Sequence, residues 1–364
     1  MLDFSLSREQ KMIKNEFARL VKDLVIEKAH DMDERGTMDL EIIQVTWEMG
    51  ASISAVPQKY GGYGAKSSPI ENCIILEELA YGDMAYAIQA SLPSLFIQPL
   101  LLFGTRVQQE KYLPIYCSEN YTACSLAFNE PWFGFDANDL RTTAVRKSGE
   151  YILNGEKCFV PLAEEASHFL VAANLDGINQ LFIIEKGGEG VEIGEREKNI
   201  GLCGLATNEM KLVDCRIPVA DRLGEESGCD FARFLQGTRV GLCAIAVGMC
   251  RATLNFVKRY AKERVQFGEP IAHRQAVAFM IAEMSYEVDA MRLLNWKAAS
   301  RLEAGKDAVR ESYLSKLLAG EKAMKICDFG VQILGGHGYI REYPVERYYR
   351  NSREVSILEG MATV

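Results

Sequence analysis

The segment that decides the fold lies near the end of the sequence and reads QILGGHGY (332–339), EYPVER (342–347), RNSR (350–353) and ILEG (357–360). Three glycines within four residues indicate a tight turn or a close approach of the backbone to a ligand, because glycine has no side chain to obstruct either. The segment closes on a carboxylate, Glu359, placed between apolar residues and a glycine. A glutamate held in such surroundings is a candidate general base, and an exposed glutamate near the chain end would fit this pattern about equally well.

The first part of the sequence, residues 1–121, has the pattern of packed helices. Apolar residues recur at helical spacing around Phe17, and Ser7 with Gln10 three positions later is typical of a helix-capping box. The run YGGYG at 60–64 predicts a loop, because glycine runs break periodic structure. These features predict an N-terminal helical domain.

Residues 122–226 have the pattern of strands. YILNG at 151–155 predicts a strand that runs into a turn, and LFII at 181–184 is a short apolar run bounded by glycines. MKLVD at 210–214 alternates in part and stops before Pro218. These runs predict a middle β-domain.

Residues 227–364 return to helical periodicity. A methionine-rich apolar stripe between Val277 and Leu294 has a spacing of three or four residues, which predicts a helix bundle. The order of helices, strands and helices predicts an α+β fold, mostly α, and differs from the alternation of a doubly wound sheet. Neither a GxGxxG sequence nor a P-loop is present, so a Rossmann-type nucleotide site has no support.

The composition, 48% hydrophobic and 25% charged, is that of a soluble globular protein, and the net charge of −9 argues against a nucleic-acid partner. The four histidines and ten cysteines have no metal-ligand spacing, so no metal is predicted, and reduced, mostly buried thiols in a cytoplasmic protein are expected. The first four residues, MLDF, lack the basic start of a signal peptide. The uncharged run 84–105 contains glutamines and prolines, which favour a buried helix and turn over a membrane span.

Several separate motifs, in the same order, resemble the acyl-CoA dehydrogenase family over essentially the whole chain. The closing segment matches the family signature except that Asn351 replaces an aspartate and Met361 a threonine. RVQFG at 264–268 resembles the flavin motif, and GTR at 237–239 resembles the arginine that opens a helix at the substrate site. Further similarities to the N-terminal helical domain lie at 56–57, 60–64 and 77–80.

This resemblance implies an N-terminal helical domain (1–121), a middle β-domain (122–226) and a C-terminal four-helix bundle (227–364). It implies a homotetramer with FAD between the β-domain and the bundle, held in part by a neighbouring subunit. The implied reaction is α,β-dehydrogenation of an acyl-CoA thioester, in which Glu359 removes the α-proton, the β-hydrogen leaves as hydride to flavin N5, and an electron-transfer flavoprotein accepts the electrons. In the family, a flavin ribityl hydroxyl and the backbone N–H of the base polarise the thioester carbonyl.

The resemblance also assigns roles to other residues. Those that would hold the diphosphate and adenosine end of FAD are Arg264, Gln266 and Phe267. Those that would approach FAD from the neighbouring subunit are Gln332, Gly335 and Gly336. Those on the substrate side, near the base, would be Arg239 and Gly360. The alternative for each arginine is a solvated salt bridge.

Two signatures of the β-domain depart from the family pattern. NEPWFGFD at 129–136 has Asn129 in place of a threonine that faces the flavin, and Phe135 in place of a serine that faces the CoA arm. KCFVP at 157–161 places Phe159 beside the cofactor and has Pro161 in place of a flavin-contacting threonine. Proline offers neither an N–H nor a hydroxyl, so weaker polar contacts to the flavin ring are expected.

These departures leave two interpretations open. One is a working dehydrogenase with unusual flavin contacts. The other is a divergent relative, either a subunit of a mixed oligomer with an incomplete site or a non-redox enzyme on the same fold. A purely structural protein has little support, because Glu359, Arg264 and Arg239 are all retained. The segment 91–96 resembles the lining of the family's acyl pocket, but its sequence does not fix the length of the acyl chain.

Overall fold

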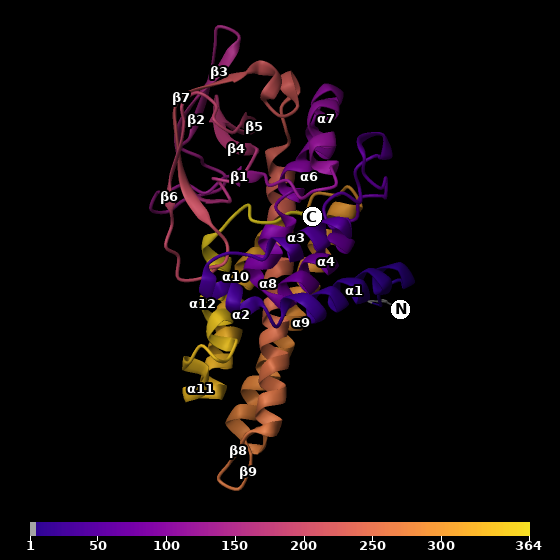
Figure 1. Ribbon diagram of the computed structural model, residues 1–364, viewed down its shortest axis with the longest axis vertical. Helices are drawn as coiled ribbons and strands as arrows, with labels where there is room; N and C mark the ends of the chain where they lie inside the picture. The colour runs from indigo at the N-terminus through magenta and orange to yellow at the C-terminus, as the bar shows by residue number, and fades with distance from the viewer. Residues whose placement is uncertain (1–4) are drawn as a thin grey trace.

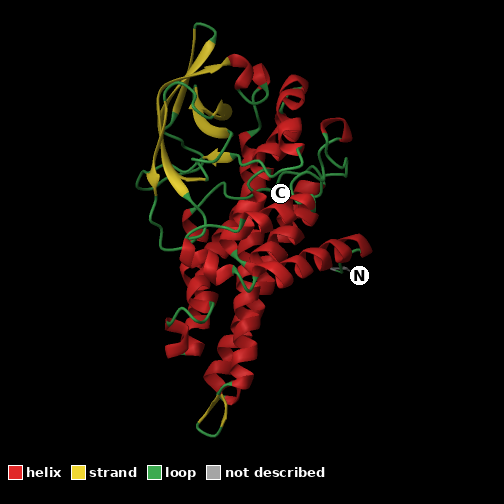
Figure 2. Ribbon diagram, in the orientation of Figure 1, coloured by secondary structure: helices red, strands yellow, loops and turns green. Residues whose placement is uncertain are grey.

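The computed structural model describes residues 5–364, so the prediction drawn from residues 1–4 lies outside the described part. The chain folds into a helical N-terminal part, a β-sheet part and a long helical C-terminal part, which confirms the predicted fold class (Figures 1 and 2). The polypeptide returns at its end to the centre of the molecule, where the three parts meet (Figure 1).

The N-terminal part consists of helices that pack on the bundle. They are α1 (Arg8–Leu20), the π-helical turn η1 (Val21–Val25), α2 (Ala29–Arg35), α3 (Leu40–Glu48), α4 (Pro69–Gly82), α5 (Met84–Ser91), α6 (Ser94–Phe103) and α7 (Arg106–Tyr112), with short 3₁₀ turns η2 (Gln58–Tyr60) and η3 (Leu113–Cys117). The predicted capping box is confirmed, since Ser7 and Gln10 exchange side-chain and backbone hydrogen bonds of 3.0 and 3.1 Å. Every residue of α5 is buried.

A seven-stranded sheet forms the middle part. Its strands are β1 (Ser125–Ala127), β2 (Thr143–Lys147), β3 (Glu150–Pro161), β4 (His168–Leu175), β5 (Ile178–Glu185), β6 (Val191–Arg196) and β7 (Thr207–Pro218), in the order β1-β4-β2-β3-β7-β6 with β5 also paired to β4. The 3₁₀ turns η4 (Val219–Asp221) and η5 (Glu225–Ser227) follow the sheet.

The turn predicted at Gly155 is wrong, because β3 continues through this residue to Pro161. The β3–β7 register shifts between Leu153 and Gly155, so a β-bulge absorbs the glycine instead of a turn. A Cβ atom at Gly155 would lie 2.5 Å from Thr142 Oγ1, which explains why glycine stands at this close approach.

The C-terminal part is a four-helix bundle with one very long helix. It comprises α8 (Phe231–Glu263), a hairpin of β8 (Val265–Gln266) and β9 (Glu269–Pro270), the turn η6 (Ile271–His273), α9 (Gln275–Glu303), α10 (Val309–Leu334), the short α11 (Gly336–Tyr339) and α12 (Val345–Ile357). Met284, Val288 and Met291 of the predicted stripe are buried, whereas Val277 and Leu294 are half-buried. The bundle extends below the rest of the molecule and ends at the β8–β9 hairpin (Figure 1).

Ion pairs join the N-terminal part to the bundle. Glu78 on α4 binds Arg251 on α8 through two bonds of 2.5 and 2.8 Å, and the neighbouring Glu77 accepts a bond of 2.9 Å from Arg292 on α9. Among the described residues, α8 has the length and apolar composition of a membrane span, and 83% of its most apolar window is buried inside the fold. Helices α5 and α6 have the length and apolar composition of a membrane span only when they are counted together, and the two helices are bent by 42° relative to each other.

Candidate active site

Glu359 lies two residues beyond α12, where the chain leaves the bundle and runs back toward the sheet. Gly360 has a left-handed backbone conformation with φ of +73°, which favours glycine. A Cβ atom at this position would lie 2.6 Å from Phe128 and 2.7 Å from Leu126, so the turn fits closely against the end of β1. The left-handed conformation and the lack of room for a side chain both explain why a glycine follows Glu359.

The carboxylate of Glu359 is asymmetrically bound. Its Oε1 atom accepts a hydrogen bond of 3.2 Å from Nε of Arg239, and the two side chains are 12% and 11% exposed. Its Oε2 atom is buried and has no hydrogen-bond partner within residues 5–364. A buried acceptor without a partner is costly in a folded protein, so its presence points to a group that approaches from a ligand. The structure thus brings together Glu359 and Arg239, which are 120 residues apart in the sequence.

The main chain of Glu359 is bound by Asn129, a contact that the sequence did not predict. The Glu359 N–H donates to Asn129 Oδ1 at 3.0 Å, and Asn129 Nδ2 donates to the Glu359 carbonyl at 2.8 Å. The family resemblance assigned this N–H to the thioester carbonyl and assigned Asn129 to the flavin. In the structure the two groups bind each other, so a thioester oxygen that accepts from this N–H would share it with Asn129 Oδ1.

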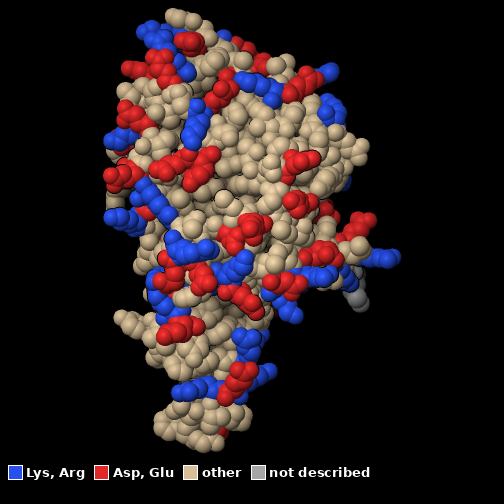
Figure 3. Space-filling model, in the orientation of Figure 1, with Lys and Arg blue, Asp and Glu red and all other residues tan. Residues whose placement is uncertain are grey.

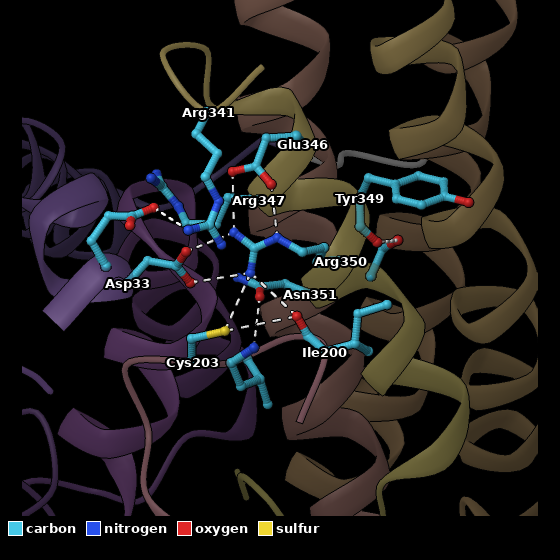
Figure 4. Close-up of polar contacts among 12 residues, drawn as sticks. Asp33, Ile200, Cys203, Arg341, Glu346, Arg347, Tyr349, Arg350 and Asn351 are labelled. Atoms are coloured by element: carbon cyan, nitrogen blue, oxygen red, sulfur yellow. Dashed lines mark hydrogen bonds and ion pairs between the residues drawn. The ribbon is translucent and has the colours of Figure 1, made fainter. Parts of the chain in front are cut away.

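Arg350 anchors α12, the helix that precedes Glu359 (Figure 4). Its guanidinium lies 2.6 Å from Asp33 on α2 and 2.7 Å from Glu346 one turn earlier on α12. It also donates to Ile200 O at 3.3 Å, in the loop between β6 and β7. Asn351, where the family has an aspartate, accepts a bond of 2.7 Å from the N–H of Leu202 in the same loop. Arg350 and Asn351 thus join all three parts of the molecule and fix the direction of α12.

The other β-domain residues that were predicted to contact the flavin use their polar main-chain groups within the protein. Phe159 has a left-handed conformation with φ of 52°, and its N–H donates to both carboxylate oxygens of Glu197 at 3.1 Å. The Pro161 carbonyl accepts a bond of 2.6 Å from the hydroxyl of Ser125. Phe135 is half-buried and stacks edge-to-face on Phe128, with 6.1 Å between ring centres. These residues offer an apolar surface with few free donors.

The residues predicted for the diphosphate end of FAD lie far from Glu359 in the same chain. Arg264, Gln266 and Phe267 occupy the β8–β9 hairpin, at the opposite end of the bundle from the returning C-terminal segment (Figure 1). Gln332, Gly335 and Gly336 are exposed where α10 meets α11, also toward this lower end. One chain therefore does not bring the two predicted halves of the site together.

The two groups at the lower end do lie close to each other. Tyr260 binds His337 at 2.9 Å, and both residues line a hollow of about 470 Å³ together with Arg264. No ion pair or hydrogen bond of the Arg264 guanidinium occurs within the described part of the chain. A Cβ atom on Gly335 or Gly336 would meet nothing within 4 Å, so a ligand or a second chain can approach the backbone there. The hollow is also lined by Arg259, Glu263 and Glu342, so it is the Arg264 guanidinium, without an internal partner, that suits an anionic group of a ligand.

The sequence did not predict that Asn129 binds the base. It also did not predict that Ser125 binds the Pro161 carbonyl or that Glu197 binds the N–H of Phe159. Asn129 and Glu359 are separated by 230 positions, and no spacing rule joins residues so far apart. The replacement of a family threonine by asparagine marked position 129 as unusual, and this was the one signal available.

Comparisons with known proteins show the family to which the chain belongs. Three family models match in order: the acyl-CoA dehydrogenase N-terminal domain at 7–120, the middle domain at 125–215 and the C-terminal domain at 230–364. The chain is 37% identical over 371 residues to the caffeyl-CoA reductase-Etf complex subunit CarC of Acetobacterium woodii, covering 98% of the chain and 96% of the relative. It is 35% identical over 374 residues to acryloyl-CoA reductase (NADH) of Anaerotignum propionicum, covering 100% and 94%.

Solved structures show the same fold. The butyryl-CoA dehydrogenase of Megasphaera elsdenii superposes with a TM-score of 0.88 at 31% identity, covering 100% of the chain and 96% of that structure. A structure described as the electron transferring flavoprotein of Acidaminococcus fermentans matches with a TM-score of 0.89 at 33% identity, covering 100% and 96%. The predicted family and the predicted FAD-dependent oxidoreductase acting on acyl-CoA are confirmed: the chain belongs to the acyl-CoA dehydrogenase family.

Proposed function

We propose that this protein interconverts a short-chain acyl-CoA and its 2-enoyl-CoA, with Glu359 as the base that handles the α-proton. We further propose that it works in the cytoplasm as a homotetramer and exchanges electrons with an electron-transfer flavoprotein. The intact Glu359–Arg239 pair supports a working enzyme over a subunit with an incomplete site.

The observation that carries this proposal is the unpaired, buried Oε2 of Glu359. Because Oε1 is held by Arg239, the carboxylate presents Oε2 in a fixed direction, away from bulk water. A general base needs such placement, since it must lie within hydrogen-bond reach of the proton that it removes. The α-proton of the thioester would pass to Oε2, and in the reverse direction Oε2 would return it to the α-carbon.

FAD, when bound, supplies the acceptor for the hydride that leaves the β-carbon. Arg264 would bind its diphosphate, because an exposed guanidinium without an ion-pair partner in the described chain pairs well with phosphate oxygens. Gln332 and the open glycines Gly335 and Gly336, which lie at the same lower end of the bundle as Arg264, would approach this part of FAD. Near the flavin ring, Asn129, Phe159 and Pro161 would mainly provide packing, since their polar groups are engaged within the protein.

The exposed apolar surface at the lower end of the bundle supports a tetramer. Phe267 is 92% exposed and Tyr339 87% exposed. The tip of the bundle is largely free of charged side chains on the face shown in Figure 3. Exposed apolar patches of this kind mark interaction sites. A neighbouring subunit that brings its Arg264 end to the Glu359 end of this chain would complete the divided site.

Small cavities support a short acyl group. The cavity lined by Ser91, Ser94 and Thr363 has a volume of about 10 Å³. This is about the room that one water molecule needs. A second cavity, between α6 and α8, has a volume of about 80 Å³ and is lined in part by Phe234 and Gly237. The relatives named for acryloyl-CoA and for short-chain substrates agree with this size.

The direction of the reaction is a separate question. Two relatives at 35% and 37% identity are named as reductases, whereas others are named as dehydrogenases. The same base and the same hydride path serve both directions.

The test is anaerobic reduction of the flavin in the purified holoenzyme by CoA thioesters from propionyl to palmitoyl. We expect bleaching of the flavin to be fastest with propionyl-CoA or butyryl-CoA, and re-oxidation by the matching enoyl-CoA. A protein that binds FAD but is reduced by no thioester in the panel would contradict the proposed activity. Fastest reduction by palmitoyl-CoA would contradict the short-chain assignment alone.

A further inference from the structure

The side chain of Asn129 binds Glu359 as a neighbouring β-strand would. Its Nδ2 donates to the Glu359 carbonyl at 2.8 Å, and its Oδ1 accepts the Glu359 N–H at 3.0 Å. One carboxamide thus satisfies both polar main-chain groups of one residue, at a position where Asn129 is only 4% exposed. Two bonds between the same two residues fix the orientation of the peptide as well as its distance.

Asn129 is itself held in a rigid frame. Its own carbonyl accepts a bond of 2.9 Å from the N–H of Cys158 on β3. The next residue, Glu130, accepts bonds of 2.8 and 2.9 Å from the N–H groups of Arg141 and Thr142. Lys157 adds an ion pair of 2.8 Å with Glu130. The position of the Asn129 side chain is therefore set by the sheet.

Glu359 has no comparable support from its own segment. The helix ends before it, and Leu358 makes the last helical bond, to Glu354 at 2.9 Å. Within residues 5–364, the two bonds to Asn129 are the main-chain hydrogen bonds that Glu359 makes. Fixing the backbone of one residue costs conformational entropy, which these bonds help to offset.

On the basis of the proposed function, we propose that Asn129 is a positioning residue for the base. It holds the Glu359 peptide while Arg239 holds Oε1, and together they direct Oε2 at the α-carbon of the thioester. A misplacement of about 1 Å can reduce a rate by roughly 100-fold. A threonine hydroxyl would have to donate and accept from one oxygen atom, whereas the carboxamide of asparagine offers its donor and its acceptor on two separate atoms that face the two main-chain groups of Glu359.

The test compares the wild-type holoenzyme with Asn129→Ala and with Asn129→Asp. Asp has the same shape, but it puts a second acceptor opposite the Glu359 carbonyl. We expect both variants to reduce their flavin roughly 10- to 100-fold more slowly at saturating butyryl-CoA. The dissociation constant for the thioester should stay within about threefold of wild type, because Asn129 acts through Glu359 and not on the ligand. Asn129→Asp also covers the case in which the alanine variant does not fold.

Asn208→Ala is the matched control, because Asn208 is 1% exposed in the same sheet and makes a side-chain bond to Gly194 but none to Glu359. In a second arm, Asn129→Ala is added to Glu359→Gln and should not slow the residual flavin reduction further. The positioning role is overturned if the Asn129 variants reduce their bound flavin as fast as Asn208→Ala does. It is also overturned if Asn129→Ala slows flavin reduction by the same factor in the Glu359→Gln variant as in the wild type. Absence of flavin reduction in the wild type would overturn the proposed activity instead.

Discussion

The Lys157 ammonium group lies 2.8 Å from the Glu130 carboxylate, and both side chains are fully buried. Lys157 also reaches the carbonyl of Phe128, and Glu130 accepts two backbone N–H bonds. Burial lowers the pKa of Lys157 from its ordinary value, while the charge of Glu130 opposes the shift. The pair thus holds the residue that follows Asn129 in the chain, and it fixes the loop on which the position of Glu359 depends.

Removal of one partner from this pair should be costly. We expect Lys157→Met to destabilise the protein by about 3–5 kcal/mol, because Glu130 would remain buried without its cation. Lys157→Met with Glu130→Gln should cost less than the two single changes added together. Urea denaturation of the four proteins measures this coupling. Lys211→Met, which removes an exposed pair at 3.9 Å from Glu156, is the control, and an effect as large as that of Lys157→Met would refute the prediction.

Glu359→Gln should separate binding from chemistry. The amide keeps the size of the side chain but cannot accept the α-proton, so flavin reduction should fall by about 100- to 10,000-fold or more. The thioester should still bind, which a perturbation of the flavin spectrum on titration with butyryl-CoA would show. Near-normal reduction in this variant would place the base elsewhere. Glu354→Gln, a buried carboxylate on α12 that does not contact Arg239, is a suitable comparison.

The sequence predicted the order of the three parts, because long periodic helices carry strong local signals, and the family resemblance placed Arg239 near Glu359, although it did not predict that the two side chains bind each other. It did not predict the bulge at Gly155, since a glycine after a strand also fits a turn. The link from Asn129 to Glu359 depends on how the sheet packs on the bundle, and no local pattern encodes that packing. The assignment of Arg264 to the FAD diphosphate stays a prediction, because in this structure Arg264 is exposed and its partner would come from outside the chain.

Mild acid should weaken the junction between the α7–η3 segment and the sheet through His168 on β4. Burial lowers the pKa of this histidine, its Nδ1 binds the Tyr116 hydroxyl at 2.9 Å, and aromatic rings surround it. Because the pKa is lower in the folded than in the unfolded state, the stabilising contribution is present above pH 6.5 and is lost as the pH falls below it. His168→Gln should therefore show a smaller decrease in melting temperature between pH 7.5 and about pH 5.5 than wild type.

The control for that experiment is His30→Gln, which removes an exposed histidine. Identical pH dependence in wild type and His168→Gln would show that protonation of His168 does not weaken the fold.

Pro161 permits a clean test of how the β-domain affects the flavin potential. Restoring threonine at both family positions would disturb the base, because Asn129 holds Glu359, so Pro161→Thr is the informative change. Pro161 ends β3 opposite Thr207, and threonine would add a hydroxyl and an N–H that proline lacks. One added donor is worth about 0.5–1.5 kcal/mol. For a two-electron couple this is about 10–30 mV, and the potential should rise because reduction adds negative charge to the ring. Spectroelectrochemical titration measures the flavin potential.

Pro218→Thr, at the other end of the same β3–β7 pair, is the control. A potential for Pro161→Thr that is no higher than that of Pro218→Thr would refute a flavin contact at this position.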